Sequence, residues 1–123
     1  MSVKPGKAKT SAVTGRRLRR HPRYRSSFPV GVTFLTEGSY RQLAAHCKDL
    51  SEAGIGVLLA AELTLGEVAS LNFALPGTRS WELRAVLRHR RGYHYGFEFF
   101  SLTQEQIESL ARYLKGLNRA DTD

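Results

Sequence analysis

The arginine-rich segment RRLRRHPRYR, residues 16–25, has the residue types to bind a compact anion. It contains six arginines and no acidic residue that would neutralise them. A guanidinium presents a rigid fork of N–H donors, which grips a phosphate through two parallel hydrogen bonds. Arg19 and Arg23 lie four residues apart, and Pro22 between them favours an extended backbone over a helix. The spacing raises the question of which anion these two side chains would hold.

A second group of polar residues follows about thirty positions after the first of these arginines. Asp49, Ser51 and Gly54 form the pattern D-x-S-x-x-G within DLSEAGIG, residues 49–56. Taken alone, the octapeptide indicates only a strand that ends in a turn, because Asp, Ser and Gly are common turn residues. Its meaning changes when it is considered together with the arginine pair.

The sequence contains no pattern that is typical of catalysis or metal binding. The four histidines lack the spacing of metal ligands, and we interpret them as surface or edge residues: His21, His46, His89 and His94. Ser51 has no G-x-S-x-G elbow, and the single cysteine, Cys47, has no partner for a disulfide or a C-x-x-C pair. Walker and Rossmann glycine patterns are missing as well. We therefore expect no enzyme, no metal and no cofactor.

The basic charge is concentrated at the N-terminus. Residues 1–25 hold nine Lys or Arg and no Asp or Glu, whereas residues 26–123 hold ten basic and eleven acidic residues. A chain of 123 residues with 41% hydrophobic residues is long enough for one domain with a core. We predict a disordered basic tail at 1–15, a single domain at 16–118 and a tail at 119–123.

The sequence from Phe28 onward is typical of short β-strands separated by turns. Val68 to Phe73 alternates between polar and apolar positions, and a Pro-Gly turn signal follows. The segments that we interpret as strands are FPVGVTFLTE, YRQLAAHCKDL, GIGVLLA, EVASLNFALPG, SWELRAVLRHR and YHYGFEFF. Short strands at this spacing predict an all-β fold, a six-stranded antiparallel barrel.

The C-terminal segment changes to helical spacing. Thr103 and Gln106 form a capping box, and apolar residues follow on one helical face: Ile107, Leu110, Ala111, Leu114 and Leu117. We therefore expect one amphipathic α-helix to close the sheet.

Both motifs, in this order and ahead of a strand-rich body and a final helix, resemble the PilZ domain family. The resemblance covers roughly residues 16–117 and includes LPG at 75–77 and YGFEF at 95–99. Members of that family bind the bacterial second messenger cyclic di-GMP, which presents two phosphodiesters and two guanines. The resemblance implies a non-catalytic receptor or adaptor with this ligand, acting in the bacterial cytoplasm. The sequence has no run of eighteen apolar residues and no secretory signal, which agrees with that location.

The resemblance also implies roles for the arginines. Arg19 and Arg23 hold guanine and phosphate, and Arg20 supports a phosphate. Arg88, on the strand before the last hairpin, is a candidate for packing against a base. Trp81 is a further candidate for stacking, although we favour an anchoring role on the barrel surface.

The D-x-S-x-x-G residues are expected to line the barrel side of the site. The carboxylate of Asp49 is an acceptor for the N1 and N2 donors of a guanine. Ser51 adds a hydroxyl contact, and Gly54 lets the backbone turn closely under the base. Leu18, the residue before the first arginine of the motif, favours one ligand molecule per chain over a stacked pair.

Ligand binding is expected to order the N-terminal arm. Its nine cationic side chains repel one another when free, and a dianion bridging arm and barrel offsets the ordering entropy. The surface formed in this way would be recognised by a downstream protein partner.

Two alternatives remain open. One is a small basic β-barrel that binds RNA or single-stranded DNA by stacking bases on exposed aromatic residues. The other is a scaffold whose arm binds anionic lipid. The balanced charge of residues 26–123 and the acid at Asp49 disfavour a polyanion, so no nucleic-acid partner is expected.

Overall fold

The computed structural model describes residues 21–36 and 38–117. The expected tails and the predicted site residues Arg19 and Arg20 lie outside this part of the chain. The described part forms strands β1 (Tyr24–Arg25), β2 (Pro29–Thr36), β3 (Ser39–Leu50), β4 (Gly54–Leu58), β5 (Val68–Ala74), β6 (Ser80–Arg91) and β7 (His94–Ser101), followed by helix α1 (Gln104–Lys115).

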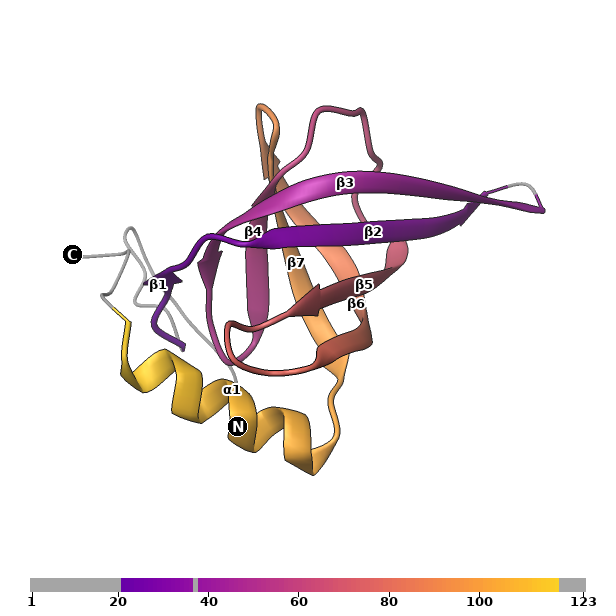
Figure 1. Cartoon of the computed structure of the whole chain (residues 1–123). Coiled ribbons are helices and arrows are strands. Elements are labelled where there is room, and N and C mark those ends of the chain that lie inside the picture. Colours follow the sequence, from indigo (N-terminus) through magenta and orange to yellow (C-terminus); the bar gives the residue numbers. More distant parts are fainter. Residues whose placement is uncertain (1–20, 37, 118–123) are drawn as a thin grey trace, which may run out of the picture.

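The strands form a closed antiparallel barrel (Figure 1). The order in the sheet is β1-β3-β2-β5-β6-β7-β4, and an additional pairing between β3 and β4 closes the ring. Six strands, β2 to β7, therefore make the barrel, which confirms the predicted fold. The two-residue strand β1 pairs outside this ring with the end of β3, Tyr24 opposite Leu50 and Arg25 opposite Asp49.

The core fills the barrel with apolar side chains that alternate along each strand. In β5 the expected alternation is confirmed, with Ala69, Leu71 and Phe73 buried between exposed or half-buried neighbours. Trp81 of β6 belongs to the same core: it is only 9% exposed and its ring lies 5.9 Å from that of Phe73. The expected anchoring role of Trp81 on the surface is therefore wrong, and the residue is not placed to stack on a ligand.

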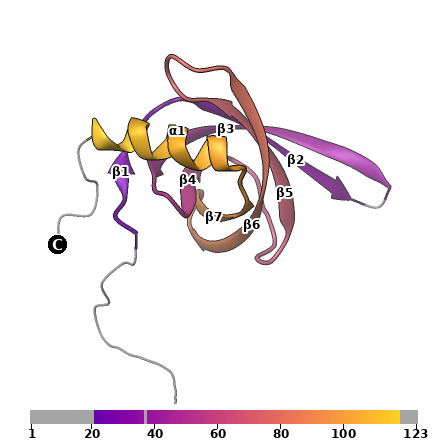
Figure 2. The same cartoon turned by 90° about the horizontal axis from the view of Figure 1, so that it is seen from below.

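Helix α1 lies across one end of the barrel (Figure 2). The predicted capping box is present, because the Thr103 hydroxyl accepts from the Gln106 backbone N–H and the Gln106 side chain accepts from the Thr103 N–H. Leu110 and Leu114 pack into the core. Ser26, just after β1, and Tyr113 of α1 share a hydrogen bond of 2.7 Å. The helix is thereby linked to the segment that leads into the barrel. Within residues 21–36 and 38–117, no helix has the length and apolar character needed to span a membrane.

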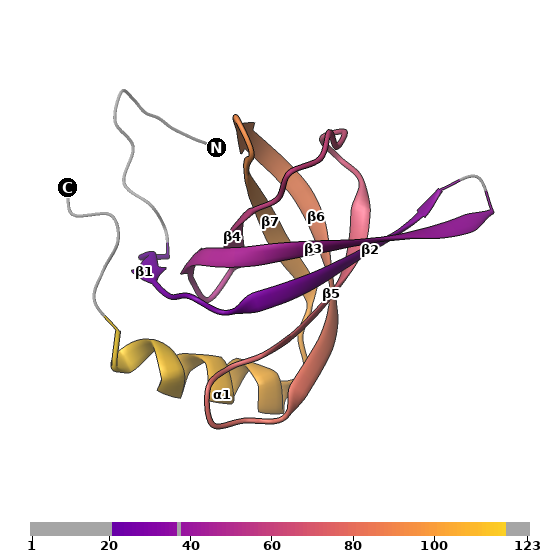
Figure 3. The same ribbon diagram turned by 45° about the horizontal axis from the view of Figure 1, so that its top comes forward.

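Strands β2 and β3 continue beyond the barrel as a projecting hairpin (Figures 1 and 3). Leu35 and Tyr40 lie opposite each other on it, and both are largely exposed. The other end of β3 reaches β1 and β4 and carries Asp49, so the hairpin and the candidate site lie at opposite ends of one strand.

Candidate functional site

A row of four residues crosses neighbouring strands on the outer surface of the barrel. Asp49 of β3 lies opposite Gly56 of β4, Gly56 opposite Gly96 of β7, and Gly96 opposite His89 of β6. A Cβ atom at position 56 would lie 2.7 and 2.8 Å from the two carboxylate oxygens of Asp49, and one at position 96 would overlap the His89 ring. The two glycines therefore form a floor over which the outer side chains extend.

A register shift by one residue precedes each of these outer side chains. Period-two alternation would place Asp49 on the same side as buried Cys47, and His89 on the same side as buried Leu87. An extra residue, as in a β-bulge, redirects the side chain that follows it. The extra residues are Lys48 in β3 and Arg88 in β6. The shifts explain why Asp49 and His89 face outward.

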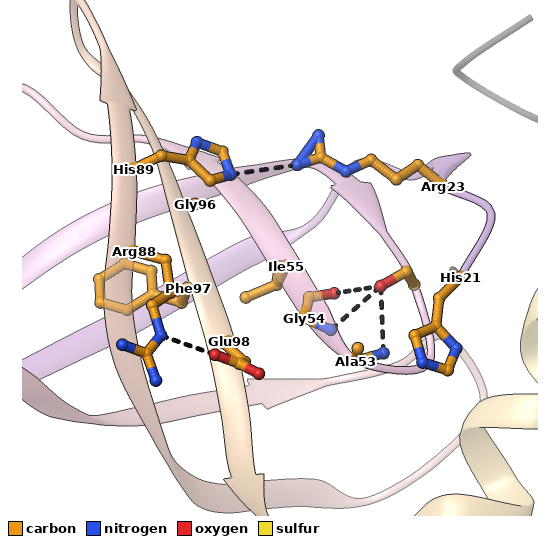
Figure 4. Close-up of a pocket in the computed structure, with 11 residues that line it drawn as sticks. His21, Arg23, Ala53, Gly54, Ile55, Arg88, His89, Gly96, Phe97 and Glu98 are labelled. Carbon is orange, nitrogen blue, oxygen red and sulfur yellow. Dashed lines mark hydrogen bonds and ion pairs between the residues drawn. The ribbon is translucent and has the colours of Figure 1, made fainter. Parts of the chain in front are cut away.

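Arg23 bridges the two ends of the row. Its Nη1 lies 3.4 Å from Oδ1 of Asp49. Its Nη2 donates to Nε2 of His89 at 3.3 Å, as Figure 4 shows. Because a guanidinium only donates, Nε2 of His89 is the acceptor and the ring proton resides on Nδ1. The exposed fractions of the Arg23 and Asp49 side chains are 19% and 13%, so the ion pair is partly shielded from solvent.

His94 of β7 contacts the other oxygen of the same carboxylate. Its Nε2 lies 3.3 Å from Oδ2 of Asp49. A continuous polar chain therefore runs from His94 through Asp49 and Arg23 to His89. The carboxylate at its centre has a contact on each side.

Ser51 and Gly54 form the turn between β3 and β4. The Ser51 N–H donates to the Gly54 carbonyl at 2.9 Å, and its hydroxyl accepts from the backbone N–H groups of Ala53 and Gly54, both at 3.1 Å. A Cβ atom at position 54 would overlap the carbonyl oxygen of Phe97 in β7. Both residues are thus required by the turn itself, and Ser51 is almost fully buried.

An open cavity of about 290 Å³ lies beside the turn (Figure 4). Four of the predicted site residues line it: Arg23, Ser51, Gly54 and Arg88. Arg88 forms an ion pair of 2.6 Å with Glu98 at the cavity wall. Asp49 does not line this cavity but a neighbouring cleft, together with Arg25, Ser26, Ser27 and Lys48. Arg23 connects the two spaces, because it lines the first and contacts Asp49.

The remaining reactive residues do not form a further site in the described part of the chain. Burial, with a smaller contribution from the Asp49 charge, raises the pKa of the Cys47 thiol to about 12. No group of three His, Cys, Asp or Glu residues among those described is arranged to hold a metal ion.

Comparison with known families assigns the fold. The family model described as PilZ domain matches residues 17–116, which is most of the chain. The chain belongs to the PilZ domain family. A search of curated proteins gave no match.

Three solved structures share the PilZ fold at low sequence identity. The Bacillus subtilis inhibitor of motility MotI (DgrA) gives a TM-score of 0.66 at 22% identity, over 80% of this chain and 50% of that one. The PilZ domain of Escherichia coli YcgR, solved with c-di-GMP, gives a TM-score of 0.63 at 19% identity. The match covers 82% of this chain and 92% of that one. The PilZ domain of CeSA from a cellulose-synthesizing bacterium gives a TM-score of 0.58 at 23% identity. The match covers 76% of this chain and 95% of that one. This chain therefore spans about half the length of MotI and almost all of the two isolated PilZ domains.

The interpretation of the histidines missed two contacts of this PilZ barrel. His89 and His94 were interpreted as surface or edge residues, yet one contacts Arg23 and the other Asp49. A signal for His89 was present in the sequence. It continues the inward-facing positions of β6, Trp81, Leu83, Ala85 and Leu87, and a polar residue in that series indicates a break in the alternation.

Proposed function

We propose that this PilZ domain is a non-catalytic receptor for cyclic di-GMP in the bacterial cytoplasm. The observation that carries the proposal is the 3.4 Å contact between Arg23 of R-x-x-x-R and Asp49 of D-x-S-x-x-G, beside an open cavity. The two motifs therefore meet at one place on the barrel. The YcgR structure with c-di-GMP supports the choice of ligand, since it has the same fold.

The chemistry of the ligand matches the donors and acceptors present. Its phosphodiesters are acceptors for the guanidinium of Arg23, and the N1 and N2 donors of a guanine require an acceptor such as the Asp49 carboxylate. Arg88 sits at the cavity wall, where its planar guanidinium is available to pack against a base. Arg19 and Arg20 complete the phosphate contacts in this proposal.

The ion pair between Arg23 and Asp49 joins two groups that the ligand also requires. A bound dinucleotide competes with Asp49 for Arg23, and the arm that precedes Arg23 then follows the ligand. We propose that the surface formed by arm and ligand is recognised by a downstream protein partner. Trypsin digestion tests the arm, because residues 16–25 contain six arginines, and equal cleavage with and without saturating ligand would contradict it.

Calorimetric titration with cyclic di-GMP, GTP, cyclic di-AMP and a short oligonucleotide tests the ligand. Charge-assisted hydrogen bonds stabilise a complex by about 1.5–3 kcal/mol each, so several of them should give micromolar affinity or better. We expect selective binding of cyclic di-GMP at one molecule per chain, and a higher ratio for Leu18→Arg. Tighter binding of the oligonucleotide would favour the RNA or single-stranded DNA alternative.

Single substitutions test the two halves of the site. Arg23→Ala and Asp49→Ala should each abolish most of the affinity while leaving the melting temperature nearly unchanged, because neither side chain belongs to the apolar core. Arg41→Ala, on the exposed projecting hairpin, is the matched control and should bind as the wild type does. Stronger binding by Asp49→Ala would mean that the carboxylate only repels the ligand.

A further inference from the structure

His94 is the one contact of the Asp49 carboxylate that comes from outside the two motifs, among the contacts described above. It is the first residue of β7 and pairs with Leu58 of β4 and Arg91 of β6. Its side chain is 29% exposed, and Nε2 lies 3.3 Å from Oδ2 of Asp49. Since a carboxylate only accepts hydrogen bonds, the Nε2 of His94 is the donor.

Among the residues that the structure describes, Gly56, Arg23 and His94 together orient the Asp49 carboxylate. Both of its oxygens lie almost equally close to the Cβ position that Gly56 leaves empty, at 2.7 and 2.8 Å, so the group extends over the glycine. Arg23 contacts Oδ1 and His94 contacts Oδ2. The terminal torsion of an aspartate has a broad energy well, so the plane of a carboxylate without such contacts is poorly fixed.

We propose that His94 is a positioning residue, which holds the Asp49 carboxylate in the orientation that accepts both N–H donors of a guanine. The inference rests on the proposed function as a cyclic di-GMP receptor. The N1 and N2 donors of a guanine are parallel, so both carboxylate oxygens must be presented to the base together. Fixing this plane before binding lowers the entropy cost of the complex.

The contact of His94 with the Asp49 carboxylate differs from that of Arg23 in its relation to the ligand. Arg23 lines the 290 Å³ cavity and is required by the phosphates of the ligand, so its contact with Asp49 is shared or lost on binding. His94 does not bind the ligand in this proposal, and its contact with Oδ2 is retained in the complex. It is then the group that keeps the carboxylate in place while Arg23 turns to the ligand.

Titration of substituted proteins with cyclic di-GMP tests the role of His94. We expect His94→Ala to weaken binding about tenfold, because the Asp49 carboxylate must then be ordered when the complex forms. His94→Gln retains an N–H donor of similar reach, and its affinity should stay within about threefold of the wild type. His46→Ala is the matched control, because His46 lies on β3 with Ser27 as its partner, and it should have no effect.

A double-mutant cycle with Asp49→Asn separates positioning from a general structural effect. In the Asp49→Asn background, His94→Ala should cause no further loss, because the carboxylate that it orients is gone. Equal or tighter binding by the single His94→Ala variant, or additive losses in the cycle, would overturn the inference while leaving the proposed function intact. Failure of the wild-type protein to bind cyclic di-GMP would overturn both.

Discussion

The imidazole of His89 lies over the backbone of Gly96, in the space that a Cβ atom at position 96 would occupy. The two residues are directly opposite each other on β6 and β7. The ring is exposed and lies at the end of a flexible side chain, so an added methyl group displaces the ring and not the strands. Gly96 thereby determines where His89 meets Arg23.

Gly96→Ala should move His89 away from Arg23 with little loss of stability. We expect the free energy of unfolding to fall by about 1 kcal/mol at most, because only an exposed side chain has to move. Urea denaturation measures the stability, and the His89 ring signals in NMR spectra report the lost contact. Gly31→Ala is the matched control, since its Cβ would make only ordinary contacts, at 3.7 Å. Unchanged His89 signals in Gly96→Ala would contradict the prediction.

Gly54→Ala should instead destabilise the barrel. The added Cβ would overlap the backbone carbonyl of Phe97. Because a backbone group cannot rotate away as a side chain can, β4 and β7 must separate locally. Overpacking of this kind costs about 3 kcal/mol or more where the backbone has to shift. Denaturation of Gly54→Ala beside the Gly31→Ala control measures the difference, and equal stability of the two variants would disprove the close approach.

The Cys47 thiol should be unreactive in the folded protein. Burial raises its pKa from 9.0 to about 12, and the thiolate is the nucleophile that thiol reagents require. At pH 8 we expect labelling only through unfolding, with fast reaction in urea. Because the thiol ionises more easily when unfolded, its contribution to stability should be constant below pH 9 and decline from pH 9 to about 12. Rapid labelling of the native protein at pH 8, absent from Cys47→Ala, would contradict the burial.

Tyr113→Phe should weaken the link between α1 and the segment after β1. The hydroxyl shares a 2.7 Å hydrogen bond with Ser26, and such bonds stabilise proteins by about 1 kcal/mol. Ser26→Ala should have a similar effect, and the double variant should lose little more than either single one. Thermal denaturation of the three variants measures this coupling, and strictly additive losses would show that the two hydroxyl groups act independently.

The fold was predictable because its periodic signals are strong. Ala69, Leu71 and Phe73 alternate as a half-buried strand should, and the pair Thr103 and Gln106 marks the start of the helix. Strand β1 was not predictable, since two residues are too few to show a period.

The candidate site was predictable only in part. The order of the two motifs indicated that Arg23 and Asp49 belong together, and they are 3.4 Å apart. The contacts of His89 and His94 depend on register across strands, which a sequence pattern does not specify. Trp81 was misinterpreted because its side chain was judged by type, although its position in the series with Leu83 and Ala85 points into the core.

Because of the register shifts at Lys48 and Arg88, the site depends on the number of residues in β3 and β6 as well as on their identity. Lys48 and Arg88 each add one residue to a strand, so the side chains that follow face the opposite side of the sheet. Loss of either codon would restore uninterrupted alternation and turn Asp49 or His89 toward the interior, where an unpaired polar group is costly. A substitution at Lys48 keeps the number of residues, so Asp49 still faces outward. Deletion of Lys48 or Arg88 should therefore disrupt the row of outer side chains more than a substitution that keeps the number of residues.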